Sequence, residues 1–96
     1  MQVIFMPAAR AELVEAQDWY ESRRLGLGVR FREEVEATVL RLRENPHQFP
    51  VVFEDLHRAR LRAFPYGLFY RIETDLLVVV ACFHGSRDPR WWERRV

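Results

Sequence analysis

The chain has 96 residues, of which 49% are hydrophobic and 30% charged, so it suits one folded domain and is too apolar for a disordered chain. A single cysteine, Cys82, excludes an intramolecular disulfide and favours a reducing compartment, which predicts a cytoplasmic protein. The longest apolar run, residues 76–83, is too short to cross a membrane, and we expect no signal peptide and no membrane association.

The formal net charge of +1 hides an asymmetry along the chain. Residues 1–55 carry seven arginines and ten acidic residues, whereas residues 56–96 carry eight arginines and four acidic residues. All fifteen basic residues are arginine, which excludes a lysine general base. Because the guanidinium is a planar fork that matches phosphate and carboxylate, the second half of the chain is expected to recognise something anionic.

Residues 3–5 predict a short first strand. Helical spacing then predicts a helix over residues 8–22, with an apolar face formed by Ala9, Leu13, Ala16 and Tyr20. Gly26 and Gly28 interrupt this pattern, and a second helix is predicted from residue 27 or 29 to residue 44. Since the link between them is so short, the two helices should form an antiparallel hairpin.

After Pro50 the pattern changes to strands, predicted at residues 51–53, 58–64, 66–72 and 76–83. The last of these is apolar throughout, as in a central strand buried on both faces. Asp88 and Pro89 are typical of a helix start and predict a short terminal helix over residues 90–96. The whole chain, residues 1–96, is therefore one α+β domain.

Several short motifs occur along the chain, and their order and spacing resemble those of one known family. They are Trp19-Tyr20-Glu21, Gly26-Leu27-Gly28, Asn45-Pro46, Phe49-Pro50, Arg60-Leu61-Arg62, Phe64-Pro65-Tyr66, Tyr70-Arg71-Ile72 and His84-Gly85-Ser86-Arg87-Asp88-Pro89. Together they resemble the RelE/ParE superfamily of toxins from type II toxin–antitoxin systems. The resemblance implies a microbial RNase-like fold, with an N-terminal strand and a helical hairpin packed on an antiparallel sheet, and a short C-terminal helix.

The superfamily divides by target: RelE-like members cut mRNA on the ribosome, and ParE-like members inhibit DNA gyrase. Arg58 and Arg60 match the basic pair of the RNases, and Arg87 matches their arginine after the last strand. Gly67 stands where the RNases carry a further arginine, and Trp91 or Trp92 stands where they often carry a terminal tyrosine. These departures favour the ParE-like branch, with no catalytic residue of its own.

Two other functions remain open. In a ribosome-dependent mRNA endonuclease, Arg58, Arg60 and Arg87 would hold the scissile phosphate, and His84 would transfer the proton. The simpler interpretation of His84 is a hydrogen-bonded residue that shapes a loop. A family member without toxicity, retained for regulation, is the third possibility.

On the ParE-like interpretation, the arginines bind protein. Arg58, Arg60 and Arg62 alternate along a predicted strand, so they should share one face, although such a face can also be merely solvated. An antitoxin with a flexible acidic tail is the expected partner, in a toxin–antitoxin hetero-oligomer. The predicted partner-binding residues are Arg58, Arg60, Arg62, Arg87, Arg90, Trp91, Trp92 and Arg94.

The sequence predicts no cofactor and no metal. His47, His57 and His84 lack the spacing of a zinc site. Cys82, inside an apolar run, is expected to be a buried small side chain and no nucleophile.

Overall fold

The computed structural model describes residues 1–86. The predicted C-terminal helix, and with it Arg87, Arg90, Trp91, Trp92 and Arg94, lies outside these residues. The elements are β1 (Gln2–Phe5), α1 (Pro7–Arg23), α2 (Leu27–Glu44), a 3₁₀ turn (Pro46–Gln48), β2 (Val51–Phe53), β3 (Leu56–Arg60), β4 (Tyr66–Glu73) and β5 (Leu76–His84).

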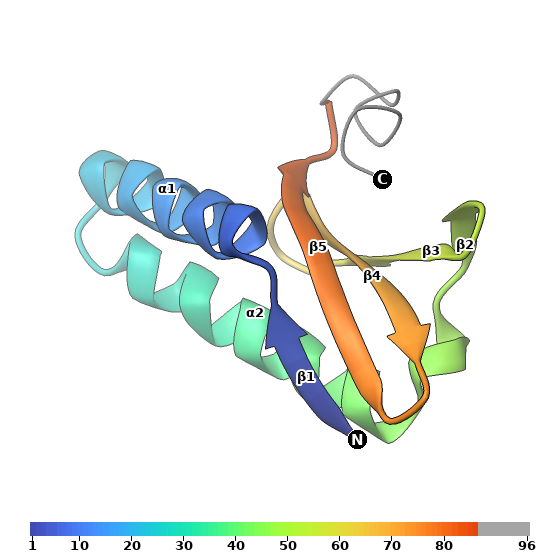
Figure 1. The fold of residues 1–96 in the computed structure, drawn as a ribbon. Coiled ribbons are helices and arrows are strands. Elements are labelled where there is room, and N and C mark those ends of the chain that lie inside the picture. Colours follow the sequence, from blue (N-terminus) through green and yellow to red (C-terminus); the bar gives the residue numbers. More distant parts are fainter. Residues whose placement is uncertain (87–96) are drawn as a thin grey trace.

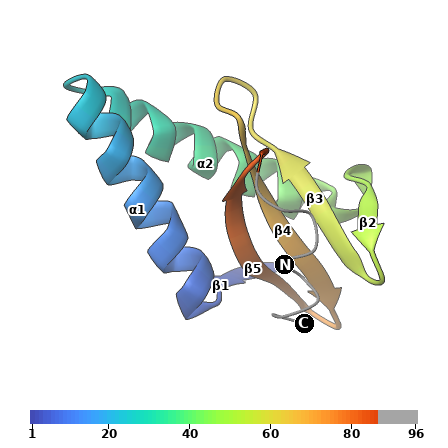
Figure 2. The ribbon, with the colours of Figure 1, turned by 90° about the horizontal axis from the view of Figure 1, so that it is seen from above.

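The molecule has two layers, a helical hairpin and a five-stranded sheet (Figure 1). Both α1 and α2 lie on one side of the sheet, as the view from above shows (Figure 2). The expected α+β class and the helical hairpin are therefore confirmed. Within residues 1–86, no helix is long and apolar enough to cross a membrane.

The strand order is β1-β5-β4-β3-β2, and β5 is the second strand from one edge. The pairs β5–β4, β4–β3 and β3–β2 are antiparallel, but β1 pairs with β5 in parallel. The four later strands are thus antiparallel, as expected, and the parallel N-terminal strand β1 makes the whole sheet mixed. A tight turn dictates the direction of the other strands, whereas the whole helical hairpin separates β1 from the sheet and leaves its direction free.

The main core fills the space between the helices and the sheet. Its largest members include Phe31 and Leu42 from α2 and Tyr70 from β4, all fully buried. At one end Tyr20 packs against Phe64 and Phe31, with ring centroids 4.8 and 5.3 Å apart. Burial of each such side chain stabilises the fold by about 1.5–3 kcal/mol, which fixes the hairpin on the sheet.

A β-bulge in β5 decides which side chains face the helices. Tyr70 pairs with Val79 and Phe69 pairs with Ala81, so β5 contains one extra residue, Val80, between these two pairs. Before the bulge, Val79 packs in the helix-side core; after it, Cys82 does. The other face holds a second apolar cluster, formed by Leu56, Phe69, Val78, Val80, Ala81 and Phe83. Because side chains alternate along a strand, the extra residue moves every later side chain to the opposite face.

The strand predicted over residues 58–64 is shorter in the structure, because β3 ends at Arg60. Arg62 lies in the turn that follows, so the prediction that it continues the strand is wrong. Glu34 of α2 explains this end: its carboxylate accepts hydrogen bonds from the backbone N–H groups of Arg62 and Ala63. These two donors are bound by the helix and are not available to a neighbouring strand.

Glu21 closes the helical hairpin. Its two carboxylate oxygens accept hydrogen bonds from the N–H groups of Gly26 and Gly28, both at 2.9 Å. A Cβ atom on Gly28 would lie 2.8 Å from the carbonyl oxygen of Gln17 and 2.9 Å from Glu21 Oε1. The close approach of α1 and α2 at this end therefore depends on Gly28.

We predict that Gly28→Ala lowers the free energy of unfolding by about 1–3 kcal/mol, because the added methyl group pushes the two helices apart. Urea denaturation followed by circular dichroism measures this change. Val29→Ala is the matched control, since Val29 is 58% exposed on the same turn of α2 and should change stability by no more than about 0.5 kcal/mol. Equal effects of the two substitutions would contradict the prediction.

Candidate functional site

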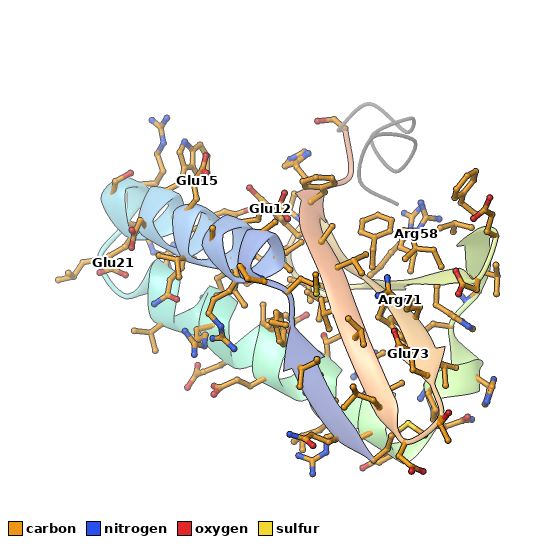
Figure 3. The ribbon with its side chains drawn as sticks, viewed as in Figure 1. Glu12, Glu15, Glu21, Arg58, Arg71 and Glu73 are labelled. Carbon is orange, nitrogen blue, oxygen red and sulfur yellow. The ribbon has the colours of Figure 1, made fainter. Side chains whose placement is uncertain are left out.

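The sheet face away from the helices carries a row of arginines, here called the arginine face: Arg58 and Arg60 of β3 and Arg71 of β4. Arg58 pairs with Phe69 and Arg60 with Gly67, so these residues share one face with the second apolar cluster. Figure 3 shows Arg58 and Arg71 on the side of the sheet away from α1 and α2. Arg71 is bound to Glu73 by an ion pair of 2.7 Å, so Arg58 and Arg60 are the cations of this face that no described carboxylate neutralises.

Arg58 is partly buried, and its environment is unusual. Its Nε atom is buried and has no hydrogen-bond partner among residues 1–86. Loss of hydration on burial, and secondarily the charge of Arg60, lowers the pKa of the Arg58 guanidinium. A guanidinium in this state gains from a carboxylate or phosphate that supplies both charge and a hydrogen-bond acceptor.

Gly67 lies beside this arginine. A Cβ atom at Gly67 would lie 3.4 Å from Cγ and 3.7 Å from Cδ of Arg58, so the Arg58 stem runs directly beside it. The position where the superfamily RNases carry an arginine is thus flanked by the side chain of another arginine.

His84 lies on the opposite face of the sheet. It ends β5, pairs with Tyr66 and contacts the Tyr66 ring at 5.3 Å between centroids. The backbone N–H of Ser86 donates to His84 Nδ1 at 3.0 Å, which places the proton of a neutral ring on Nε2. The structure brings Arg58 and Arg60 together but does not bring His84 to them.

A groove of about 760 Å³ opens on this second side, between α1 and the end of β5. Its described lining residues are Glu12, Glu15, Ala16, Trp19, Tyr20, Pro65, Tyr66, Cys82, Phe83, His84 and Ser86. Figure 3 shows Glu12 and Glu15 on α1, with Glu12 nearer to the end of β5. The sequence does not predict this groove, because its walls come from three segments that are far apart in the chain. The position of Trp19 at the edge of the hairpin, half exposed, is its one visible sign.

A comparison with known protein families shows to which family the chain belongs. A family model described as "ParE toxin of type II toxin-antitoxin system, parDE" matches residues 3–89. The chain belongs to this ParE toxin family. A solved structure of the "Chromosomal ParDE TA system from P. aeruginosa" superposes with a TM-score of 0.75, over 88% of this chain and 95% of that one, at 16% sequence identity. At this identity the likeness establishes the fold alone. No curated protein matches the chain.

The polar side chains of this ParE family member form no evident metal site within residues 1–86, where no three His, Cys, Asp or Glu residues cluster. His57 instead stacks on Tyr70 at 5.0 Å, and its Nδ1 bonds the carbonyl oxygen of Phe49 at 2.8 Å. His47 lies 6.3 Å from the His57 ring. His57 therefore has a structural contact on each side, which links the 3₁₀ turn region to β3 and β4.

Cys82 lies under the groove and is almost fully buried. Its backbone N–H donates to Glu12 Oε1 at 3.0 Å. Burial, and secondarily the Glu12 charge, raises the pKa of the Cys82 thiol to about 12. A thiol in this state is a poor nucleophile at neutral pH, in keeping with the expected role of a small buried side chain.

We predict that the toxin loses stability as the pH rises from about 9 to about 12, because the unfolded thiol ionises at its ordinary pKa of 9.0 while the native thiol stays protonated. The protonated Cys82 thiol makes its full contribution to the free energy of unfolding below pH 9. This free energy should fall by roughly 2–4 kcal/mol between pH 9 and pH 12. Urea denaturation at several pH values measures it. Cys82→Ala should show a shallower decline, with the remainder due to tyrosines such as Tyr70, whose pKa burial raises to about 12. Parallel profiles for the two proteins would contradict the assignment to Cys82.

Proposed function

We propose that this toxin inhibits DNA gyrase, does not cut RNA, and is neutralised in the cytoplasm by direct binding of a cognate antitoxin. The observation that carries the proposal is the separation of the candidate RNase residues. Arg58 and Arg60 lie on one face of the sheet, and His84 lies on the other, beside Tyr66 in the groove.

RNA cleavage requires a proton-transfer group within hydrogen-bond reach of the phosphate that the arginines hold. A sheet separates His84 from Arg58 and Arg60, and the Nδ1 acceptor of His84 is already used by Ser86. The one acidic side chain of β4 on the arginine face, Glu73, is held by Arg71. The arginine face can therefore bind an anion but, within residues 1–86, offers no suitable general base.

The same face suits an acidic protein segment. The partly buried Arg58 has a vacant donor, Arg60 adds a second charge, and a carboxylate can accept two parallel hydrogen bonds from a guanidinium. We assign antitoxin binding to this face and to the arginines and tryptophans that follow it in sequence, in a toxin–antitoxin hetero-oligomer. The assigned residues are Arg58, Arg60, Arg62, Arg87, Arg90, Trp91, Trp92 and Arg94.

A direct comparison of targets tests the proposal. We expect the purified toxin to block supercoiling by DNA gyrase and to leave mRNA intact on programmed ribosomes. The measurements are a supercoiling gel and primer extension on the mRNA. Cleavage of mRNA with normal supercoiling would establish the RelE-like function instead. Inactivity in both assays would support a member without toxicity.

We predict that the double variant Arg58→Ala, Arg60→Ala binds the antitoxin more weakly by about 10–100-fold, because antitoxin carboxylates lose their bidentate partners. Isothermal titration calorimetry with the antitoxin encoded beside the toxin gene measures the affinity. The matched control is Arg30→Ala, Arg43→Ala, which removes two exposed arginines from α2. An equal loss in both double variants would show that net charge alone matters and would contradict a specific arginine face.

A further inference from the structure

The groove between α1 and the end of β5 has the opposite charge from the arginine face. Two carboxylates, Glu12 and Glu15, line it, and no arginine is among its described lining residues, although residues 1–86 contain eleven. Its walls are aromatic, from Trp19 and Tyr20 of α1 and Tyr66 of β4. Carboxylates beside aromatic rings form the usual environment for a bound cation.

Glu15 is the carboxylate best placed to meet a ligand. It is exposed on α1, and no hydrogen bond or ion pair joins it to another residue of the described chain. Burial is the main cause that raises the pKa of Tyr66, followed by Tyr20 and Cys82, and the Glu15 charge makes the smallest contribution. Glu12 differs, because one of its oxygens holds the Cys82 backbone.

Trp19 already binds a cation of the chain itself. The Arg23 guanidinium lies 4.6 Å from the centre of the Trp19 ring, and the ring remains 50% exposed. Tyr20 supports Trp19 edge-on, with 5.1 Å between ring centroids. The indole is thus fixed in place and partly open, which lowers the entropic cost of packing a further side chain against it.

We infer that the groove receives an arginine or lysine side chain of the antitoxin, whose charged end pairs with Glu15 and whose aliphatic stem packs against Trp19 and Tyr66. This assignment rests on the proposed function, in which the antitoxin binds directly. It adds that the antitoxin must present a basic residue here, in addition to the acidic residues that fit the arginine face.

The strand register explains how one partner reaches both surfaces. Arg60 pairs with Gly67 and Gly67 with Phe83 on the arginine face, while the next residues, Tyr66 and His84, pair on the groove side. The end of β5 is therefore the boundary between the two surfaces. A single antitoxin segment that crosses this end can place acidic residues on one side and a basic residue on the other.

The test compares two neutral substitutions on α1. Glu15→Gln removes the groove charge, and Asp18→Asn removes an exposed charge of the same helix that does not line the groove. We expect Glu15→Gln to weaken binding of the antitoxin encoded beside the toxin gene by about tenfold in calorimetry, and Asp18→Asn to leave it within about twofold. Equal affinities for the two variants, with normal binding by the wild type, would overturn the groove assignment alone.

Absence of binding by the wild-type toxin would instead overturn the proposed function, and the groove assignment with it. A double-mutant cycle identifies the residue bound: each antitoxin arginine or lysine is changed to glutamine and measured against wild-type toxin and Glu15→Gln. At one antitoxin position, the substitution to glutamine should weaken binding to the wild-type toxin but cause no additional loss of affinity for the Glu15→Gln toxin. Additive losses at every position would overturn the assignment. So would a Glu15→Gln variant that binds the antitoxin normally but loses gyrase inhibition or self-association, because the occupant would then be gyrase or a second copy of the chain.

Discussion

The extra residue at Val80 in β5 is the constraint on which the surfaces of this toxin depend. It reverses the alternation of side chains for the last part of the strand, so Cys82 and His84 face the helices and Phe83 faces the arginines. Without it, simple alternation from Val79 would direct His84 to the same face as Arg58 and Arg60. A single backbone irregularity thus separates a histidine from the cations with which it could form a phosphate-cleaving site.

Separation of the two faces leaves the molecule with two surfaces of opposite charge, joined at the end of β5. Opposite charges on adjoining surfaces specify the orientation of a partner as well as its affinity, because a reversed partner would meet like charges on both sides. The glycine at position 67 contributes to the same arrangement. It lies beside the stem of Arg58, so the position of an expected arginine is flanked by another arginine of the same face.

Much of this fold could be predicted from the sequence. The helical spacing located α1 and α2 to within a residue or two, and the aromatic and branched residues of β4 and the continuous apolar run of β5 located these strands similarly well. The bulge could not be predicted, because β5 is apolar on both faces and carries no polar residue that would reveal a change of register. The contact of Glu34 with Arg62 and the groove beside Glu15 could not be predicted for a different reason. Each joins segments that are far apart in sequence, and local patterns carry no information about such contacts. The branch of the family was nevertheless correct, since it depended on residue identities at Gly67 and the C-terminal tryptophans.

The burial of Cys82 has a practical consequence for following this toxin in complexes. The chain has one cysteine, and its thiol is protonated and covered in the native protein. A second cysteine placed at Leu25, which is 92% exposed at the tip of the helical hairpin, would therefore be the preferred site for a maleimide dye. The absence of lysine leaves amine-reactive dyes only the α-amino group. Two different dyes can thus be attached to the same molecule by independent chemistry, and energy transfer from either dye to a labelled partner would report the orientation in which that partner binds.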